Sequence, residues 1–96
     1  MYQVVLSGQS ASKLKDLHHR AKEKGQGGRF LSATKKILTF LRTEPLHFGE
    51  PRFALKNLSL EVRVAAVSPL LVVYGVHEGR RLVFIRDILR LPGTDF

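Results

Sequence analysis

Apolar residues recur with two different periods along this chain, and the change of period separates a helical part from a strand-like part. The run from Tyr2 to Leu6 is short and β-branched, which predicts a strand. Apolar side chains then follow at spacings of three and four between residues 14 and 21. This spacing predicts a helix with one narrow apolar face, capped at its N-terminus by Ser10 or Ser12.

A second helix is predicted from Arg29 to about Arg42, where the apolar stripe is wider. Gly25-Gln26-Gly27-Gly28 separates the two helices, because glycine adopts the left-handed conformation of a helix C-terminus without strain. The two helices therefore form an αα-hairpin. The next segment, Thr43 to Pro51, contains two prolines and a glycine without periodicity, and it predicts a loop.

Strand-like patterns fill the rest of the chain. Leu58 to Val67 alternates, which predicts a half-buried strand. Its apolar side consists of Leu60, Val62 and Val64, and its other side of Glu61, Arg63 and Ala65. Leu70 to Val76 is almost entirely apolar, as is typical of a central strand covered on both faces.

The last predicted elements are a hairpin turn from His77 to Arg80 and a returning strand from Arg81 to Leu89. The element order is therefore β-α-α-β-β-β. We expect a single α+β domain over residues 1–96, with a helical hairpin packed on a small, mainly antiparallel sheet.

The charge favours a polyanionic partner. Sixteen Lys and Arg stand against eight Asp and Glu in 96 residues, a formal charge of +8. Cysteine is absent, which excludes a disulfide scaffold, a thiolate zinc site and a cysteine nucleophile. No basic leader and no apolar stretch of membrane-spanning length is visible, so the sequence predicts a cytoplasmic protein without membrane contact.

Most of the positive charge lies on the predicted helical hairpin. Between Lys13 and Lys36, eight basic residues face two acidic ones. This surface either binds nucleic-acid phosphates or is simply a solvated helix face. The candidate nucleic-acid-binding residues are Lys22, Lys24, Lys35 and Lys36, together with Arg86 on the last strand.

Single arginines on the predicted sheet, with a histidine at the hairpin turn, are the candidates for chemistry. Guanidinium groups on a rigid sheet suit bidentate contacts to phosphate, although solubility and salt bridges to Glu61, Glu78 and Asp87 explain them equally well. The histidine is the only nearby group that titrates near neutral pH. The glycine segment after the first helix lacks the ending of a phosphate-binding loop, and no metal-ligand spacing is present, so no cofactor or metal is expected. The candidate catalytic residues are Arg63, Arg81, Arg90 and His77.

The segment from Asn57 to Leu91 resembles the C-terminal half of RelE/ParE-type toxins of bacterial toxin–antitoxin modules. The similar features are an arginine-bearing strand, a short corner, a Val-Tyr-x-Val strand, an acidic-glycine turn and a Val-Phe-Ile strand. The upstream Phe48-Gly49-x-Pro51 also fits. This resemblance implies the same β-α-α-β-β-β order, and a toxin neutralised by a cognate antitoxin, which we expect to be acidic.

The resemblance implies one of two targets, mRNA on the ribosome or DNA gyrase. In the RelE branch, metal-free RNA cleavage uses basic residues and a C-terminal tyrosine. Arg63 and Arg90 fit the family's basic positions, whereas Pro69-Leu70 replaces another arginine and Phe96 stands where the tyrosine would be. We therefore expect weak or no nuclease activity, with gyrase or another protein as the target. The alternatives are a non-catalytic RNA- or ribosome-binding module and an inactive toxin homologue.

Overall fold

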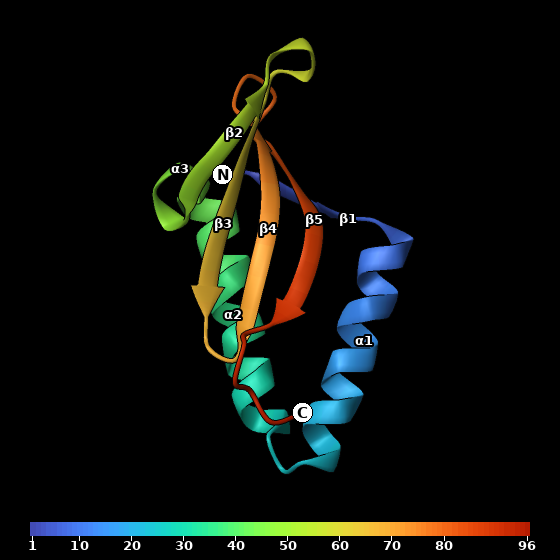
Figure 1. The fold of residues 1–96 in the computed structure, drawn as a ribbon. Helices are drawn as coiled ribbons and strands as arrows, with labels where there is room; N and C mark the ends of the chain where they lie inside the picture. The colour runs from blue at the N-terminus through green and yellow to red at the C-terminus, as the bar shows by residue number, and fades with distance from the viewer.

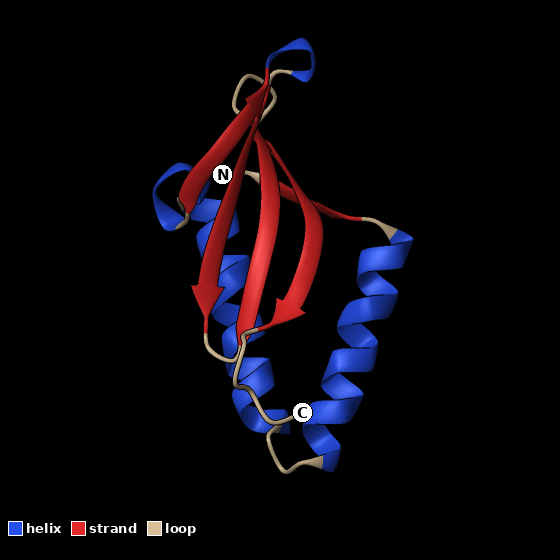
Figure 2. Cartoon of the chain, viewed as in Figure 1, coloured by secondary structure: helices blue, strands red, loops and turns tan.

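The computed structural model describes residues 1–96 as an α+β fold in which helices pack against a five-stranded mixed sheet (Figures 1 and 2). The elements in chain order are β1 (Gln3–Leu6), α1 (Gly8–Glu23), α2 (Gly27–Thr43), α3 (Pro45–Phe48), β2 (Glu50–Leu55), a 3₁₀ turn (Lys56–Leu58), β3 (Leu60–Val67), β4 (Leu70–His77) and β5 (Leu82–Arg90). None of the helices is long and apolar enough to cross a membrane.

The strands lie in the order β1-β5-β4-β3-β2. β1 pairs with β5 in parallel, and the remaining neighbours are antiparallel. The predicted meander is present as β3, β4 and β5. The loop predicted from Thr43 to Pro51 is wrong in part, because this segment holds α3 and the first residues of β2. β2 lies at the sheet edge and is exposed along almost its whole length, so it carries no apolar alternation that could reveal it.

The helix starts differ from the expected ones by several residues. Ser7 caps α1, since its side chain accepts a hydrogen bond from the Ser10 amide at 3.1 Å, so the predicted caps at residues 10 and 12 are wrong. Gly25 has a φ of +72° and ends the first helix as expected. Gly27, in contrast, is already the first residue of α2.

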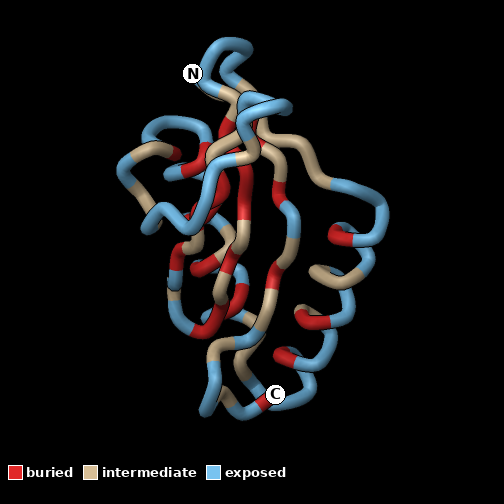
Figure 3. Tube along the Cα trace, turned by 45° about the horizontal axis from the view of Figure 1, so that its top comes forward, coloured by how far each residue is buried: buried red, intermediate tan, exposed pale blue.

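The helices cover one face of the sheet. The apolar stripe of α2 (Phe30, Ala33, Ile37 and Leu41) packs on alternate residues of β4, from Leu70 to Val76. Figure 3 shows the buried positions on the strands and on the sheet-facing sides of the helices. α1 buries only three residues and runs beside the C-terminal half of β5 (Figure 1).

β3 turns its predicted polar side toward the helices. Arg63 lies directly opposite Tyr74, and Ala65 opposite Val72, and both of these β4 residues belong to the core under the helices. The predicted polar side of β3 therefore faces the helix layer, while Val62 and Val64 point to the other face of the sheet. That face carries no helix, so the expectation that β4 is covered on both sides is wrong. The uncovered side is called the open face below.

Candidate binding groove on the open sheet face

The open face holds a groove of about 590 Å³. Its floor is apolar and comes from β3 and β4, and its walls come from the strands on either side of them, β2 and β5. The floor residues are Val62, Val64 and Val73, and the wall residues are Arg52 and Phe53 on β2 and Arg86 and Asp87 on β5.

Two β-bulges put an arginine on each wall. In the β2–β3 pair, Pro51 and Phe53 oppose consecutive residues of β3, which leaves Arg52 as the extra residue. In the β4–β5 pair, Ile85 and Asp87 oppose consecutive residues of β4, which leaves Arg86 as the extra residue. A bulge bends its strand and redirects the side chain of the additional residue. Both irregularities of the sheet therefore contribute a guanidinium group to the same groove.

One pair of side chains reaches across the groove. β2 and β5 are separated by two strands, which corresponds to roughly 14 Å at the usual strand spacing. The Arg86 guanidinium nevertheless lies 6.0 Å from the centre of the Phe53 ring. Phe53 is 51% exposed, whereas Val62, its neighbour on β3, is almost fully buried although no helix covers it. The Arg86–Phe53 pair thus shields part of the apolar floor.

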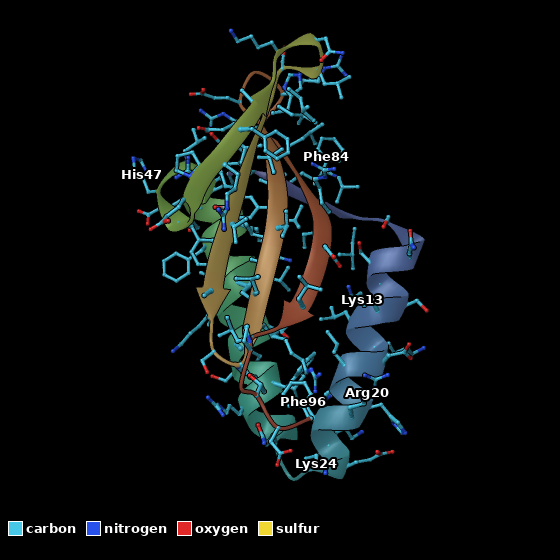
Figure 4. All side chains as sticks on the ribbon, in the orientation of Figure 1. Lys13, Arg20, Lys24, His47, Phe84 and Phe96 are labelled. Atoms are coloured by element: carbon cyan, nitrogen blue, oxygen red, sulfur yellow. The ribbon has the colours of Figure 1, made fainter.

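The groove carries net positive charge. Asp87 is its only acidic residue, and its carboxylate accepts hydrogen bonds from Lys13 Nζ at 2.6 Å and from the Ile88 amide at 2.9 Å. Lys13 lies on α1, beside the groove-forming edge of β5 (Figure 4). The side chain of Arg52 makes no ion pair. Two guanidinium groups and an exposed aromatic ring suit a ligand with phosphate or carboxylate groups and a flat ring.

A buried polar cluster holds the start of β2 in place. The Tyr74 hydroxyl donates to the Pro45 carbonyl at 2.8 Å and accepts from the Gly49 amide at 3.0 Å. Arg63 donates to the Gly49 carbonyl at 2.5 Å and forms an ion pair with Glu61 at 3.3 Å. Because Arg52 follows Gly49 by three residues, this cluster fixes the wall of the groove from the opposite side of the sheet.

The same cluster has two local consequences: its burial raises the pKa of Tyr74, and its packing requires glycine at position 49. Burial raises the pKa of Tyr74, and the hydrogen bonds from Gly49 and Arg63 oppose that rise only in part. The tyrosine therefore stays neutral at physiological pH. A Cβ at position 49 would lie 2.6 Å from the Val64 carbonyl oxygen and 3.0 Å from the Tyr74 hydroxyl, so only glycine fits there without displacement.

The structure does not bring the four predicted catalytic residues together. Arg63 is 7% exposed, faces the helix layer and is engaged with backbone and carboxylate, so it cannot reach a ligand in the groove. Arg81 immediately precedes β5 and Arg90 is its last residue, which places them roughly 30 Å apart. His77 lies at the Arg81 end.

Each of the other three has a local contact. The His77 Nδ1 atom accepts a hydrogen bond from the Arg80 amide at 3.1 Å and so closes the hairpin turn. The Arg81 guanidinium lies 5.9 Å from the centre of the Tyr2 ring. Arg90 donates to the Phe96 carbonyl and holds the C-terminal segment against the body. The Phe96 ring is buried and packs edge-on against the Phe30 ring, with 6.3 Å between the ring centres. Position 96 therefore belongs to the core.

The predicted nucleic-acid-binding residues fall into two separate groups. Lys22, Lys24, Lys35 and Lys36 are all exposed on the helical hairpin, and Lys24 lies at its far end (Figure 4). Arg86 belongs to the groove on the other face of the sheet. A single ligand of modest size cannot contact both groups.

Arg52 and Phe53 are groove residues that the sequence analysis missed. The run Arg52-Phe53-Ala54-Leu55 contains an aromatic and a leucine after a proline, which is compatible with an edge strand, but nothing in it indicates the bulge. Asp87 was expected to pair with an arginine and pairs with Lys13 instead, whereas the expected Glu61–Arg63 pair is present. No family model, curated protein or solved structure matches this chain.

Proposed function

We propose that this protein is the toxin component of a RelE/ParE-type toxin–antitoxin module, and that it inhibits growth by binding a target in the groove rather than by cutting RNA. The observation that carries the proposal is the groove itself, in which two bulge arginines and an exposed phenylalanine surround an apolar floor. A rigid, charged and partly apolar surface of this kind suits the recognition of a macromolecule.

The composition of the groove argues against hydrolysis. Metal-free RNA cleavage needs one group that removes the proton of the 2′-hydroxyl and one that protonates the leaving oxygen. Arginine remains protonated at ordinary pH and is a poor proton donor. The Asp87 carboxylate is already held by Lys13 and by a backbone amide. The position expected for a catalytic tyrosine carries the buried Phe96.

Gyrase is the target we propose, and an acidic antitoxin is the proposed neutralising partner. A second candidate function is a basic RNA- or ribosome-binding module without toxicity. The exposed Phe53 ring beside Arg86 favours this alternative, because an aromatic platform next to a guanidinium group also accepts an unpaired base and its phosphate.

Induced expression in a bacterial host tests the proposal. We expect growth arrest with the wild type, and recovery with the double variant Arg52→Ala/Arg86→Ala. The matched control is Arg20→Ala/Lys36→Ala, which removes the same charge from the helical surface and should remain toxic. Normal growth with all three proteins, at equal soluble levels, would reject the toxin function.

Three further measurements separate the targets. Inhibition of gyrase supercoiling by the purified protein supports the proposal. Discrete cuts in translated mRNA, detected by primer extension, would contradict the non-cleaving mechanism. Retention of labelled single-stranded RNA without any effect on growth would favour the second candidate.

A further inference from the structure

A second hollow, partly open to solvent, lies between the sheet and the helix pair. It has a volume of about 150 Å³, and eight of its ten lining residues are hydrophobic. β1, α1, α2, β4 and β5 all contribute to its wall, which includes Leu14, Leu38 and Ile85. It lies on the helix-covered side of the sheet and is therefore separate from the groove described above.

The polar lining of this cavity consists of only two residues. Thr34 uses its hydroxyl to donate to the Phe30 carbonyl at 3.0 Å, so its proton is not available to a ligand. Arg42 lies in the last turn of α2 and is exposed, and its guanidinium makes no ion pair or hydrogen bond with the protein. No acidic residue lines the cavity. An apolar chamber thus has one unpaired cation beside it.

We propose that this cavity binds a small amphipathic carboxylate, with its apolar part among the leucine and isoleucine side chains and its carboxylate on Arg42. A volume of about 150 Å³ is sufficient for a molecule the size of benzene. Arginine is the side chain best suited to a carboxylate, because it offers parallel N–H donors in one plane. The ligand class is therefore a carboxylate with one aromatic ring or a short alkyl chain.

An entry path adjoins the cavity. A third hollow, of about 310 Å³, lies between α1 and α2 and shares Leu6, Leu14 and Thr34 with the cavity. This hollow is open and includes Lys15 and the exposed Leu31 at its rim. We therefore expect a ligand to enter the cavity from the side of the two helices.

Charge and polarity exclude other ligand classes. An ammonium group of the same size would meet the positive charge of Arg42, and a polyphosphate would have to lose its water in an apolar chamber. A neutral alcohol fits the cavity but forms no charge-assisted hydrogen bond. The carboxylate should therefore bind more tightly than the alcohol, and the amine least.

Titration of the full chain with benzoate, benzyl alcohol and benzylamine, followed by methyl NMR, tests the proposal. We expect benzoate to shift the methyl signals of Leu14, Leu38 and Ile85 and to bind about tenfold more tightly than benzyl alcohol. Arg42→Met should weaken benzoate about tenfold and leave benzyl alcohol unchanged. The control Lys36→Met, elsewhere on α2, should change neither affinity.

Several results would overturn the proposal. One is the absence of shifts at these methyl groups up to millimolar benzoate. Another is equal binding of benzoate and benzyl alcohol to the wild-type protein, which requires no variant and so remains decisive if Arg42→Met does not fold. A third is unchanged benzoate affinity in a folded Arg42→Met protein.

Discussion

Removal of one oxygen atom, in Tyr74→Phe, tests how the groove wall is held. The hydroxyl makes two hydrogen bonds, to the Pro45 carbonyl at 2.8 Å and from the Gly49 amide at 3.0 Å. The ring itself is completely buried and stacks on the Phe48 ring, with 6.0 Å between the two ring centres. A phenylalanine at this position preserves that packing. The variant therefore removes the polar contacts and leaves the shape of the core unchanged.

The expected loss is about 2–3 kcal/mol in the free energy of unfolding. A hydrogen bond contributes roughly 1 kcal/mol net, and a buried partner left without one adds a penalty of similar size. For a domain of this length, such a loss lowers Tm by about 10–20 °C. The assay is thermal and urea denaturation at pH 7. Tyr2→Phe is the matched control, because no hydrogen bond of its hydroxyl is present, and it should change stability by less than about 0.5 kcal/mol.

The raised pKa of Tyr74 predicts that the stability of the fold depends on pH in the alkaline range. The pKa of Tyr74 is raised above 10.0 in the folded protein, chiefly by burial. Between pH 10 and the folded pKa, the folded state binds more protons than the unfolded state, so stability falls as pH rises through this range. Tyr74→Phe should remove this part of the fall. Equal stability of Tyr74→Phe and Tyr2→Phe at pH 7, with identical alkaline profiles, would refute our account of the cluster.

Two other predictions concern charge and the C-terminal segment. If the helical hairpin binds phosphates, charge reversal at its exposed lysines should weaken RNA binding and reduce the dependence of affinity on salt. The lysines are Lys22, Lys24, Lys35 and Lys36. An unchanged salt slope in a filter-binding assay would contradict this role. Phe96→Tyr should not create RNA cleavage in a primer-extension assay, because this ring is packed against Phe30, and the appearance of cuts would show that the position reaches a substrate.

The sequence predicts the helices and the central strands well because their apolar periods report burial directly. It fails at β2, where an edge strand with exposed side chains leaves no such period. It also leaves the orientation of β3 undetermined. The alternation of Val62 and Arg63 shows that they lie on opposite faces, but it cannot show which face the helices cover. In the structure Arg63 faces the helices, and its charge is matched by Glu61.

The candidate site is harder to predict for a related reason. Arg52 and Arg86 meet at the groove because each is the extra residue of a bulge, and a bulge depends on how two strands pair across many residues. No local pattern contains that information. Arg63, in contrast, is conspicuous in the sequence because it interrupts an apolar strand. Its burial beside Tyr74 gives it a positioning role for β2 instead of direct contact with a ligand.

The contact between Arg86 and Phe53 has a consequence for binding in the groove. It shields Val62 from water in the free protein, and a cation–π contact at an exposed site contributes only about 0.5–1 kcal/mol. A ligand that offers its own flat ring to Phe53 and its own anion to Arg86 replaces this contact with two stronger ones. The Arg86–Phe53 contact therefore opposes binding only weakly, while the Tyr74 cluster keeps the β2 backbone fixed.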